Sequence, residues 1–344
     1  MSALKKISGK SIMNAQNKEN AMNHKTVYNL ASLIFALLLP ISALAVCPDP
    51  ETVTTVPKLV NVAVKATATY DSTTKIYSYF YSINNKSENI GCIWHYEIDI
   101  NKPASGLSLP KDGLVNAPKF ASLIVPGQDK PTMVPVTFPS VPQINNIITW
   151  AAGLTVEGHA SWGSRRYEYE LEPGNTISGI VMTSYGLPTI RDIKVQPKFI
   201  ADEEDILKTG VSEEDFIPNA WKYINDFYDS LSWKGKSIGP TAPPANFQAI
   251  TFIDYIIDLK HQAASLGWIV QEGILDSLDA KLDNAKLKLS QGNNLAAKNI
   301  LIAFINESEA QACATYENCP PGKNLMPEAY VLLKYNVAYL INKL

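Results

Sequence analysis

Histidine and catalytic motifs are scarce in this chain. Only four of its 344 residues are histidines, and three of these, His95, His159 and His261, follow the N-terminal 45 residues. The sequence has no G-x-S-x-G, no H-E-x-x-H, no phosphate-holding glycine loop and no dinucleotide fingerprint. Because the common catalytic classes depend on such groups, we expect a protein that is not an enzyme and that carries no cofactor.

Basic residues are also in the minority. The chain has 30 Lys and Arg against 33 Asp and Glu, a formal net charge of −3. Residues 1–45 hold five lysines and one glutamate, so their removal changes the net charge to −7. An acidic chain without a basic stripe binds nucleic acid poorly and is weakly attracted to anionic lipid. We expect no nucleic-acid partner, and no stable membrane insertion once this segment is removed.

The first 45 residues have the pattern of a secretory signal peptide. Lys25 precedes an apolar run over residues 30–45 that ends in Ala-Leu-Ala. A basic region, an apolar core and small residues at the end predict cleavage between Ala45 and Val46. The mature protein is therefore expected in the periplasm or outside the cell.

Three alternatives concern this N-terminal segment. Met22 is an alternative start that gives a signal of ordinary length. Lipid attachment at Cys47 is disfavoured because Val46 is larger than the residue usually found before a lipidated cysteine. An uncleaved apolar anchor is disfavoured by Pro40 and by the short apolar core.

Cysteine is the other scarce residue. The four cysteines are Cys47, Cys92, Cys313 and Cys319, and all follow the predicted cleavage site. They allow three pairings, of which the short separation favours Cys313–Cys319 and leaves Cys47–Cys92. The rival interpretation is a metal site, but no C-x-x-C pair occurs. In an exported chain, structural disulfides are the stronger expectation, and we expect no metal.

The residues between 59 and 195 show short alternating runs separated by Pro, Gly and Asn. In the clearest run, Tyr77, Tyr79 and Tyr81 share a face, and such alternation is typical of strands with one buried side. The expected strands are 59–69, 76–83, 93–100, 120–125, 133–138, 147–156, 166–171, 177–185 and 190–195. Many short strands with frequent turns predict an antiparallel β-sandwich, Ig-like or jelly-roll-like, over residues 46–198.

From residue 247 to 344 the periodicity is helical. Apolar residues recur at steps of three and four in four segments, the first of which holds Phe252, Ile256, Leu259, Ala263 and Leu266. Gly267 and Gly292 suit helix C-termini, Asn294 suits an N-cap and Pro327 suits a first turn. Short connections predict an antiparallel helical bundle.

Residues 199–246 separate these two parts. They contain acidic runs at 202–205 and 213–215, a short aromatic helix, and glycines and prolines over 234–244. This composition indicates an interdomain linker. The predicted fold is therefore α+β with two domains, an N-terminal β-sandwich and a C-terminal helical bundle.

Several short stretches of residues 247–344 together resemble the sequence of a known helical module. They are Leu266-Gly267-Trp268-Ile269, Ser277-Leu278-Asp279-Ala280-Lys281-Leu282, Gly292-Asn293, Ala303-Phe304-Ile305 and Glu328-Ala329-Tyr330-Val331-Leu332-Leu333. Together they resemble the helical module called FIMAH, which occurs at the C-terminus of exported bacterial proteins. The resemblance covers residues 247–344 and implies an accessory, non-catalytic role.

Five aromatic residues are candidates for ligand contact. Tyr77, Tyr79 and Tyr81 form a stripe on one strand, and Trp150 and Trp162 lie near predicted loops. Exposed rings offer flat apolar faces on which sugars stack. The favoured interpretation is that the tyrosine rings fill the sandwich core, as aromatic residues of strands often do. Trp150 and Trp162 are slightly better candidates for an exposed contact, because they lie near predicted loops.

A second candidate lies on the polar side of one strand. His95, Glu97 and Asp99 alternate with apolar residues, so their side chains share a face and have the donor atoms that a divalent cation needs. The alternative is an ordinary solvated face. The acidic runs at 202–205 and 213–215 suggest calcium, but they lack the D-x-D-x-D-G pattern and also suit helix starts.

These observations predict an exported, non-catalytic accessory or binding protein of the cell envelope or the extracellular space. Its partner is expected to be a glycan or an envelope protein. Two alternatives remain: a secreted polysaccharide hydrolase that uses paired carboxyl groups, which leave no sequence motif, and a structural component of the cell surface.

Overall fold

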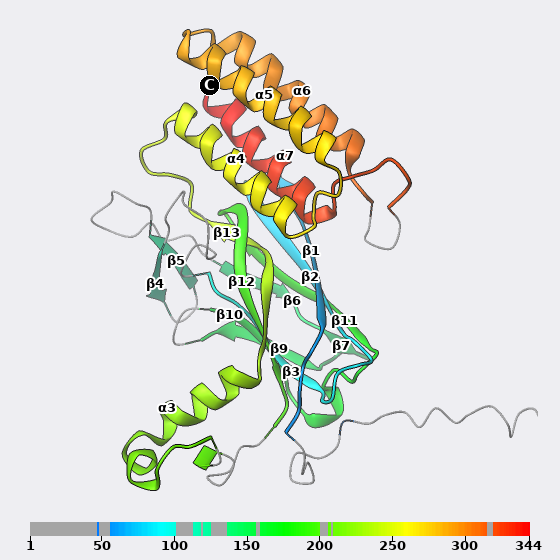
Figure 1. The fold of residues 1–344 in the computed structure, drawn as a ribbon, viewed down its shortest axis with the longest axis vertical. Coiled ribbons are helices and arrows are strands. Elements are labelled where there is room, and N and C mark those ends of the chain that lie inside the picture. Colours follow the sequence, from blue (N-terminus) through cyan, green and yellow to red (C-terminus); the bar gives the residue numbers. More distant parts are fainter. Residues whose placement is uncertain are drawn as a thin grey trace, which may run out of the picture. The chain divides into compact units, whose positions relative to one another are not determined.

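The computed structural model describes Cys47 and residues 56–100, 113–117, 120–124, 136–155, 159–199, 206–207, 209–314 and 319–344. The predicted signal peptide, with its cleavage site between Ala45 and Val46, and the acidic run 202–205 lie outside these residues. The chain from Cys47 to Leu344 forms one compact unit. Antiparallel sheets occupy its N-terminal part and helices its C-terminal part, which confirms the α+β prediction (Figure 1).

The first sheet has four antiparallel strands in the order β1-β2-β11-β6. They are β1 Val62–Asp71, β2 Ile76–Asn85, β11 Thr176–Ser184 and β6 Val136–Ser140. The alternation read in β2 is confirmed, because Tyr77, Tyr79, Tyr81 and Ile83 are all buried. One face of this sheet therefore lies in the core.

The second sheet has five antiparallel strands in the order β13-β12-β3-β10-β9. They are β13 Trp233–Thr241, β12 Leu187–Pro197, β3 Ile93–Ile98, β10 Ala160–Ser164 and β9 Trp150–Leu154. β13 differs from the sequence analysis, which read 234–244 as part of a linker. It is an edge strand, where Pro240 is tolerated, and a Cβ added at Gly239 would lie 2.9 Å from Cγ of Arg191.

Two short hairpins and a 3₁₀ helix connect these strands. The hairpins are β4 Gly113–Ala117 with β5 Phe120–Ile124, and β7 Gln143–Ile144 with β8 Ile147–Ile148. The predicted strand 166–171 is wrong: Tyr167–Tyr169 form a 3₁₀ helix, and Leu171 makes a single bridge to Ile93. The indole N–H of Trp150 donates to the carbonyl oxygen of Tyr169 (2.7 Å), which holds this turn beside β9.

Aromatic rings from both sheets meet in the core. The ring of Tyr81 on β2 lies 5.9 Å from that of Tyr96 on β3 and 5.8 Å from that of Trp162 on β10, centroid to centroid. Phe138 of β6 meets Trp162 edge-on at 5.4 Å. Such pairs add about 0.5–1.5 kcal/mol beyond the burial of their apolar surface. They fix how the inner faces of the two sheets pack.

Five helices lie in the C-terminal part of the described chain. They are α3 Glu213–Leu231, α4 Ala249–Ser265, α5 Glu272–Ser290, α6 Asn294–Gln311 and α7 Pro327–Lys343. The apolar face predicted for the first bundle helix is buried on α4, except that Leu266, which follows its last residue, is 37% exposed. Burial of this face is the main force that holds an amphipathic helix in place.

The predicted helix ends are correct to within one residue. Gly267 and Gly292 have φ of +74° and +71° and follow the ends of α4 and α5. Pro327 is the first residue of α7. The N-cap of α6 is Asn293 instead of the predicted Asn294, and its side-chain oxygen accepts from the amide of Ala296 at 3.0 Å.

Helix α7 lies against the edge of the first sheet. Its Glu328 Oε1 accepts from the amide of Ala66 on β1 (2.8 Å), and Asn336 Nδ2 donates to the carbonyl of Pro188 on β12 (2.8 Å). The hydroxyl of Tyr255 on α4 also bonds Thr189 Oγ1 (2.7 Å). The buried apolar residues of α4 to α7 and of the strands belong to one hydrophobic cluster. Helices α4 to α7 therefore share one core with the strands.

The structure contains the two disulfides that the spacing favoured, Cys47–Cys92 and Cys313–Cys319. Disulfides form and persist in oxidising compartments, so they indicate an exported environment. No helix in the described ranges is long and apolar enough to cross a membrane.

Candidate functional site

A row of charged side chains lies on the outer face of the second sheet. Strand β3 supplies His95 and Glu97, and β12 supplies Lys194, which is paired in register with Glu97. His159 directly precedes β10, whose Ala160 pairs with Ile98. Side chains two residues apart on a strand share a face, so the register brings residues from three strands together.

Glu97 is the centre of this row. Its Oε2 lies 3.0 Å from Nδ1 of His159 and 3.5 Å from Nζ of Lys194, and its Oε1 lies 3.2 Å from Nδ1 of His95. Burial alone would raise the pKa of the Glu97 carboxyl, but the hydrogen bonds to both histidines and the charge of Lys194 hold that pKa far below its usual range. Glu97 is therefore a carboxylate at neutral pH and has no proton to donate.

His159 lies between two carboxylates. Its Nδ1 faces Glu97, and its Nε2 lies 3.7 Å from Oδ1 of Asp99. Burial disfavours the charged imidazole, yet the hydrogen bond with Glu97 and the charges of Asp99 and Glu97 outweigh it and raise the pKa of His159. With an acceptor at each ring nitrogen, the protonated ring is the form that satisfies both contacts.

Helix α3 closes this row into a groove. Asp229 of α3 pairs with Lys194 (3.6 Å) and with Lys234 of β13. Beneath the helix lies a hollow of about 500 Å³, and a neighbouring one of about 250 Å³ shares Glu97, His159, Lys194 and Asp229 with it. The larger hollow is also lined by Trp94, Gln196, Ile224, Asn225, Asp226 and Tyr228. Most of its charged groups already have partners, so a ligand meets amides, a phenol and compensated charges.

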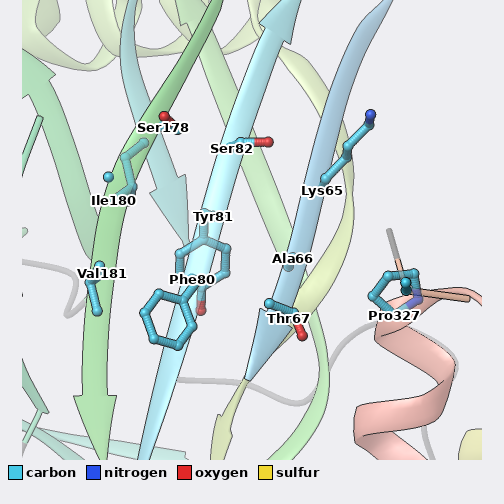
Figure 2. A pocket seen from close by; sticks show the side chains of 12 residues that line it. Lys65, Ala66, Thr67, Phe80, Tyr81, Ser82, Ser178, Ile180, Val181 and Pro327 are labelled. Carbon is cyan, nitrogen blue, oxygen red and sulfur yellow. The ribbon is translucent and has the colours of Figure 1, made fainter. Parts of the chain in front are cut away.

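A second hollow lies on the outer face of the first sheet. Figure 2 shows it between β1, β2 and β11 and the start of α7, with a volume of about 340 Å³. Its lining includes Lys65, Thr67, Phe80, Ser82 and Pro327. It lacks the convergence of hydrogen-bonding side chains seen beneath α3, so the α3 groove is the stronger candidate for a ligand site.

The structure places the five predicted aromatic contact residues in the core. Trp150, Trp162 and Tyr79 are 0% exposed, Tyr81 is 3% exposed and Tyr77 is 7% exposed. The hydroxyl of Tyr79 donates to the carbonyl of Gly186 (2.8 Å) and that of Tyr81 to Ile238 (3.1 Å). No face of these rings is open to a sugar, so the stacking hypothesis is wrong for these five residues, and the core interpretation that the sequence favoured is confirmed.

The second candidate was partly found from the sequence. His95, Glu97 and Asp99 do lie close together, but His159, Lys194 and Asp229 were not assigned to the same site. The alternation of polar and apolar residues along β3 predicted that His95, Glu97 and Asp99 share a face. The others depend on which strands pair and in which register, which a single sequence does not contain.

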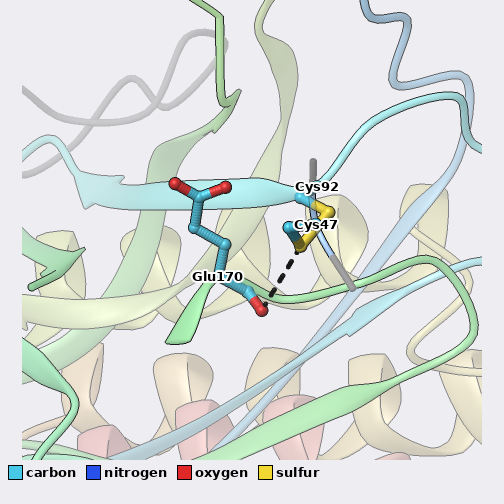
Figure 3. Close-up of side chains that lie close together, drawn as sticks. All are labelled: Cys47, Cys92 and Glu170. Carbon is cyan, nitrogen blue, oxygen red and sulfur yellow. Dashed lines mark hydrogen bonds between the residues drawn. A yellow bond between two sulfur atoms is a disulfide. The ribbon is translucent and has the colours of Figure 1, made fainter. Parts of the chain in front are cut away.

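The histidine and carboxylate row is not a preformed metal site. In the described chain, one group of histidine, cysteine or acidic residues has its ligand atoms within 4.8 Å of one another, and it is Cys47, Cys92 and Glu170 (Figure 3). The acidic run 202–205 of the calcium hypothesis lies outside the described residues. Asp215 Oδ2 accepts from Ser212 Oγ (2.6 Å) at the start of α3.

No protein-family model matches the chain, and no curated protein matches it.

Proposed function

We propose that this is an exported, non-catalytic accessory protein that binds a glycan in the groove beneath α3. The groove offers the exposed amide of Asn225 beside carboxylates whose charges Lys194 and His159 already balance. Gln196 and Tyr228 also line it. Gln196 Oε1 faces Nδ1 of His95 (3.2 Å) and the Tyr228 hydroxyl donates to the carbonyl of Phe199 (2.7 Å), so a ligand meets their remaining hydrogen-bonding capacity. Neutral sugars carry many hydroxyl groups, so they suit amide and carboxylate partners whose charge is compensated. This lining is the observation that carries the proposal.

The architecture supports the same proposal. We infer that the strand-built part is a β-sandwich of Ig-like or jelly-roll-like type and that α4 to α7 form a FIMAH-like module that spaces or docks it. Ligand contacts on such folds are commonly made by side chains on a rigid scaffold. The two disulfides and the acidic net charge fit a protein that works in the periplasm or outside the cell.

A polysaccharide hydrolase is less well supported. Glycoside cleavage needs one protonated carboxyl group beside a second carboxylate. Among the described residues, the carboxyl groups with a raised pKa are Glu170 and Glu328, and neither lines the groove in which Glu97 lies. Glu97 itself is held ionised. The carboxyl groups of the groove therefore suit binding better than proton transfer.

The test combines binding and turnover. The chain beginning at Val46 is applied to a glycan array and to a panel of chromogenic glycosides, together with the Asn225→Ala variant. We expect binding without turnover, and a dissociation constant about tenfold higher for Asn225→Ala, as the loss of one polar contact implies. Asn284→Ala, an exposed asparagine on α5 far along the chain, is the matched control and should bind as the parent does.

Three outcomes count against the proposal. Release of chromophore from any glycoside overturns the non-catalytic role. Binding that Asn225→Ala leaves unchanged moves the site away from α3. If the array shows no bound glycan and the protein captures one envelope protein at fixed stoichiometry, the partner is a protein and not a glycan.

A further inference from the structure

One buried group takes no part in the groove beneath α3. It consists of Cys47, Cys92 and Glu170, whose sulfur and carboxylate oxygen atoms all lie within 4.8 Å of one another (Figure 3). The three residues are 3%, 7% and 7% exposed. Two sulfurs and one carboxylate oxygen at such separations are the donor set of a zinc site with three protein ligands.

One carboxylate oxygen of Glu170 has no hydrogen-bond partner among the described residues of the oxidised protein. This oxygen, Oε2, is buried. Buried polar atoms nearly always have a hydrogen-bond partner. A buried carboxylate oxygen without one, on a residue whose carboxylate lies near two sulfurs, suggests that Glu170 binds an ion when the disulfide is reduced.

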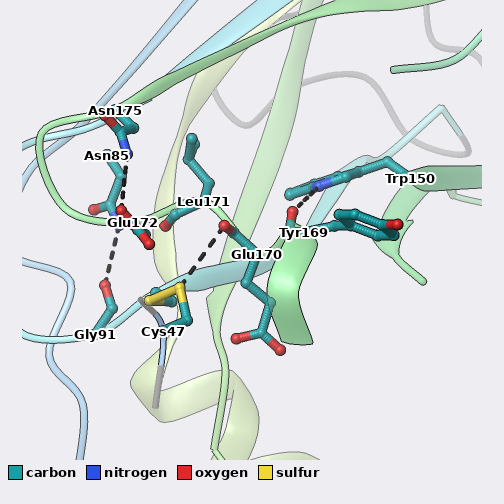
Figure 4. Close-up of a disulfide and its surroundings, with 10 residues drawn as sticks. Cys47, Asn85, Gly91, Trp150, Tyr169, Glu170, Leu171, Glu172 and Asn175 are labelled. Carbon is teal, nitrogen blue, oxygen red and sulfur yellow. Dashed lines mark hydrogen bonds between the residues drawn. A yellow bond between two sulfur atoms is a disulfide. The ribbon is translucent and has the colours of Figure 1, made fainter. Parts of the chain in front are cut away.

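The positions of Cys92 and Glu170 do not depend on the disulfide. The residues that follow them, Ile93 and Leu171, exchange two backbone hydrogen bonds of 2.9 Å and 2.8 Å. Asn85 Nδ2 donates to the carbonyls of Leu171 (2.8 Å) and Gly91 (3.0 Å), as Figure 4 shows for the residues around the disulfide. Both ligands are therefore anchored to the sheet when the sulfur–sulfur bond is open.

Cys47 is close enough to complete the set. Its Cα lies 5.9 Å from that of Cys92, and its Sγ lies 3.7 Å from the carbonyl oxygen of Glu170. A disulfide sulfur has no proton, so the distance between Cys47 Sγ and the Glu170 carbonyl oxygen is a contact and not a hydrogen bond in the oxidised form. Only the thiol of the reduced form has a proton to donate to this oxygen. Tetrahedral zinc with bonds of about 2.3 Å holds two sulfurs roughly 3.8 Å apart, a separation that rotation of the two side chains supplies.

We propose that the reduced form of this group binds one zinc ion through Cys47, Cys92 and Glu170. A dithiol reductant opens the disulfide, giving two thiols and the oxidised, cyclic form of the reductant. Zinc then displaces one proton from each thiol, and water fills the fourth position. Two thiolates and one carboxylate around Zn²⁺ leave a charge of −1, which the ammonium of Lys198 partly offsets.

Disulfide formation and metal binding then exclude each other. An oxidant that joins the two sulfurs removes both thiolate ligands and releases the ion. The same cysteines hold zinc in a chain that has just been exported and is still reduced, and close the disulfide once they are oxidised.

The test uses the chain beginning at Val46 with Cys313→Ser and Cys319→Ser, so that Cys47 and Cys92 are the only thiols. After reduction and removal of the reductant under argon, Zn²⁺ is titrated against a chromophoric chelator, and Co²⁺ is added separately to look for thiolate-to-metal absorption. We expect one ion per reduced chain and none per oxidised chain. Glu170→Gln should raise the dissociation constant by more than the roughly 10- to 100-fold typical of losing an outer-shell partner.

Glu172→Gln is the matched control, because Glu172 lies two residues away and its carboxylate accepts from its neighbour Asn175 at 3.1 Å. Equal affinities for Glu170→Gln and Glu172→Gln overturn the proposal. So does an affinity that is unchanged in urea, since that shows binding by unfolded thiols. If Glu170→Gln does not fold by circular dichroism, the Co²⁺ spectrum of the parent decides: absence of thiolate absorption rejects the site.

Discussion

Replacing Glu328 with glutamine is expected to stabilise the protein at alkaline pH by several kcal/mol. Burial raises the pKa of this carboxyl group from 4.5 to about 8, although the amide of Ala66 donates to it. The folded protein keeps the proton up to about pH 8, whereas the unfolded chain releases it near pH 4.5. Stability is therefore full below about pH 4.5 and is lost as the pH rises toward 8, on the order of 4 kcal/mol in total.

Urea unfolding followed by circular dichroism between pH 4 and pH 9 measures this dependence. Glutamine keeps the oxygen that accepts from Ala66 and has no proton to lose. The Glu328→Gln curve should therefore be flatter, and the two curves should diverge progressively as the pH rises from about 4.5 to about 8. Glu272→Gln, in the exposed first turn of α5, is the matched control and should follow the parent. Parallel curves for Glu328→Gln and the parent would show that Glu328 is ionised in the folded protein.

Much of the fold could be predicted from local patterns. The alternation of Tyr77, Tyr79 and Tyr81 identified β2, and the steps of three and four identified α4 to α7, because each pattern reports which face an element buries. β13 was missed because its glycines and prolines are typical of connectors. Its strand conformation comes from pairing with β12 over nine residues, and no local feature of 233–241 indicates that partner.

The candidate site was predicted less completely, for the same physical reason. Glu97 and His95 share a strand, so their proximity follows from a period of two. His159 is 62 positions along the chain from Glu97, and Asp229 reaches Lys194 from a helix. Burial of the aromatic candidates was equally non-local: Tyr81 and Trp162 are core residues because two sheets meet there.

Replacing Asp279 with alanine is expected to destabilise the protein by about 3 kcal/mol. Asp279 on α5 pairs with Lys260 on α4 (2.6 Å), and the Lys260 side chain is 0% exposed. Burial lowers the pKa of Lys260, and the bond and charge of Asp279 oppose that shift. Removal of one partner leaves a buried ammonium, which typically destabilises by about 3–5 kcal/mol. The lower end applies because Asp279 is itself 24% exposed.

Urea unfolding at pH 7 measures this loss, with Asn284→Ala as the control because Asn284 lies on the same helix α5, is exposed and carries no charge that acts on Lys260. The control should change stability by no more than about 0.5 kcal/mol. The double replacement Lys260→Met with Asp279→Leu should recover most of the loss, since apolar residues of similar volume often replace a buried ion pair without loss of stability. If Asp279→Ala unfolds like Asn284→Ala, the ammonium of Lys260 is reached by water and the pair is a surface one.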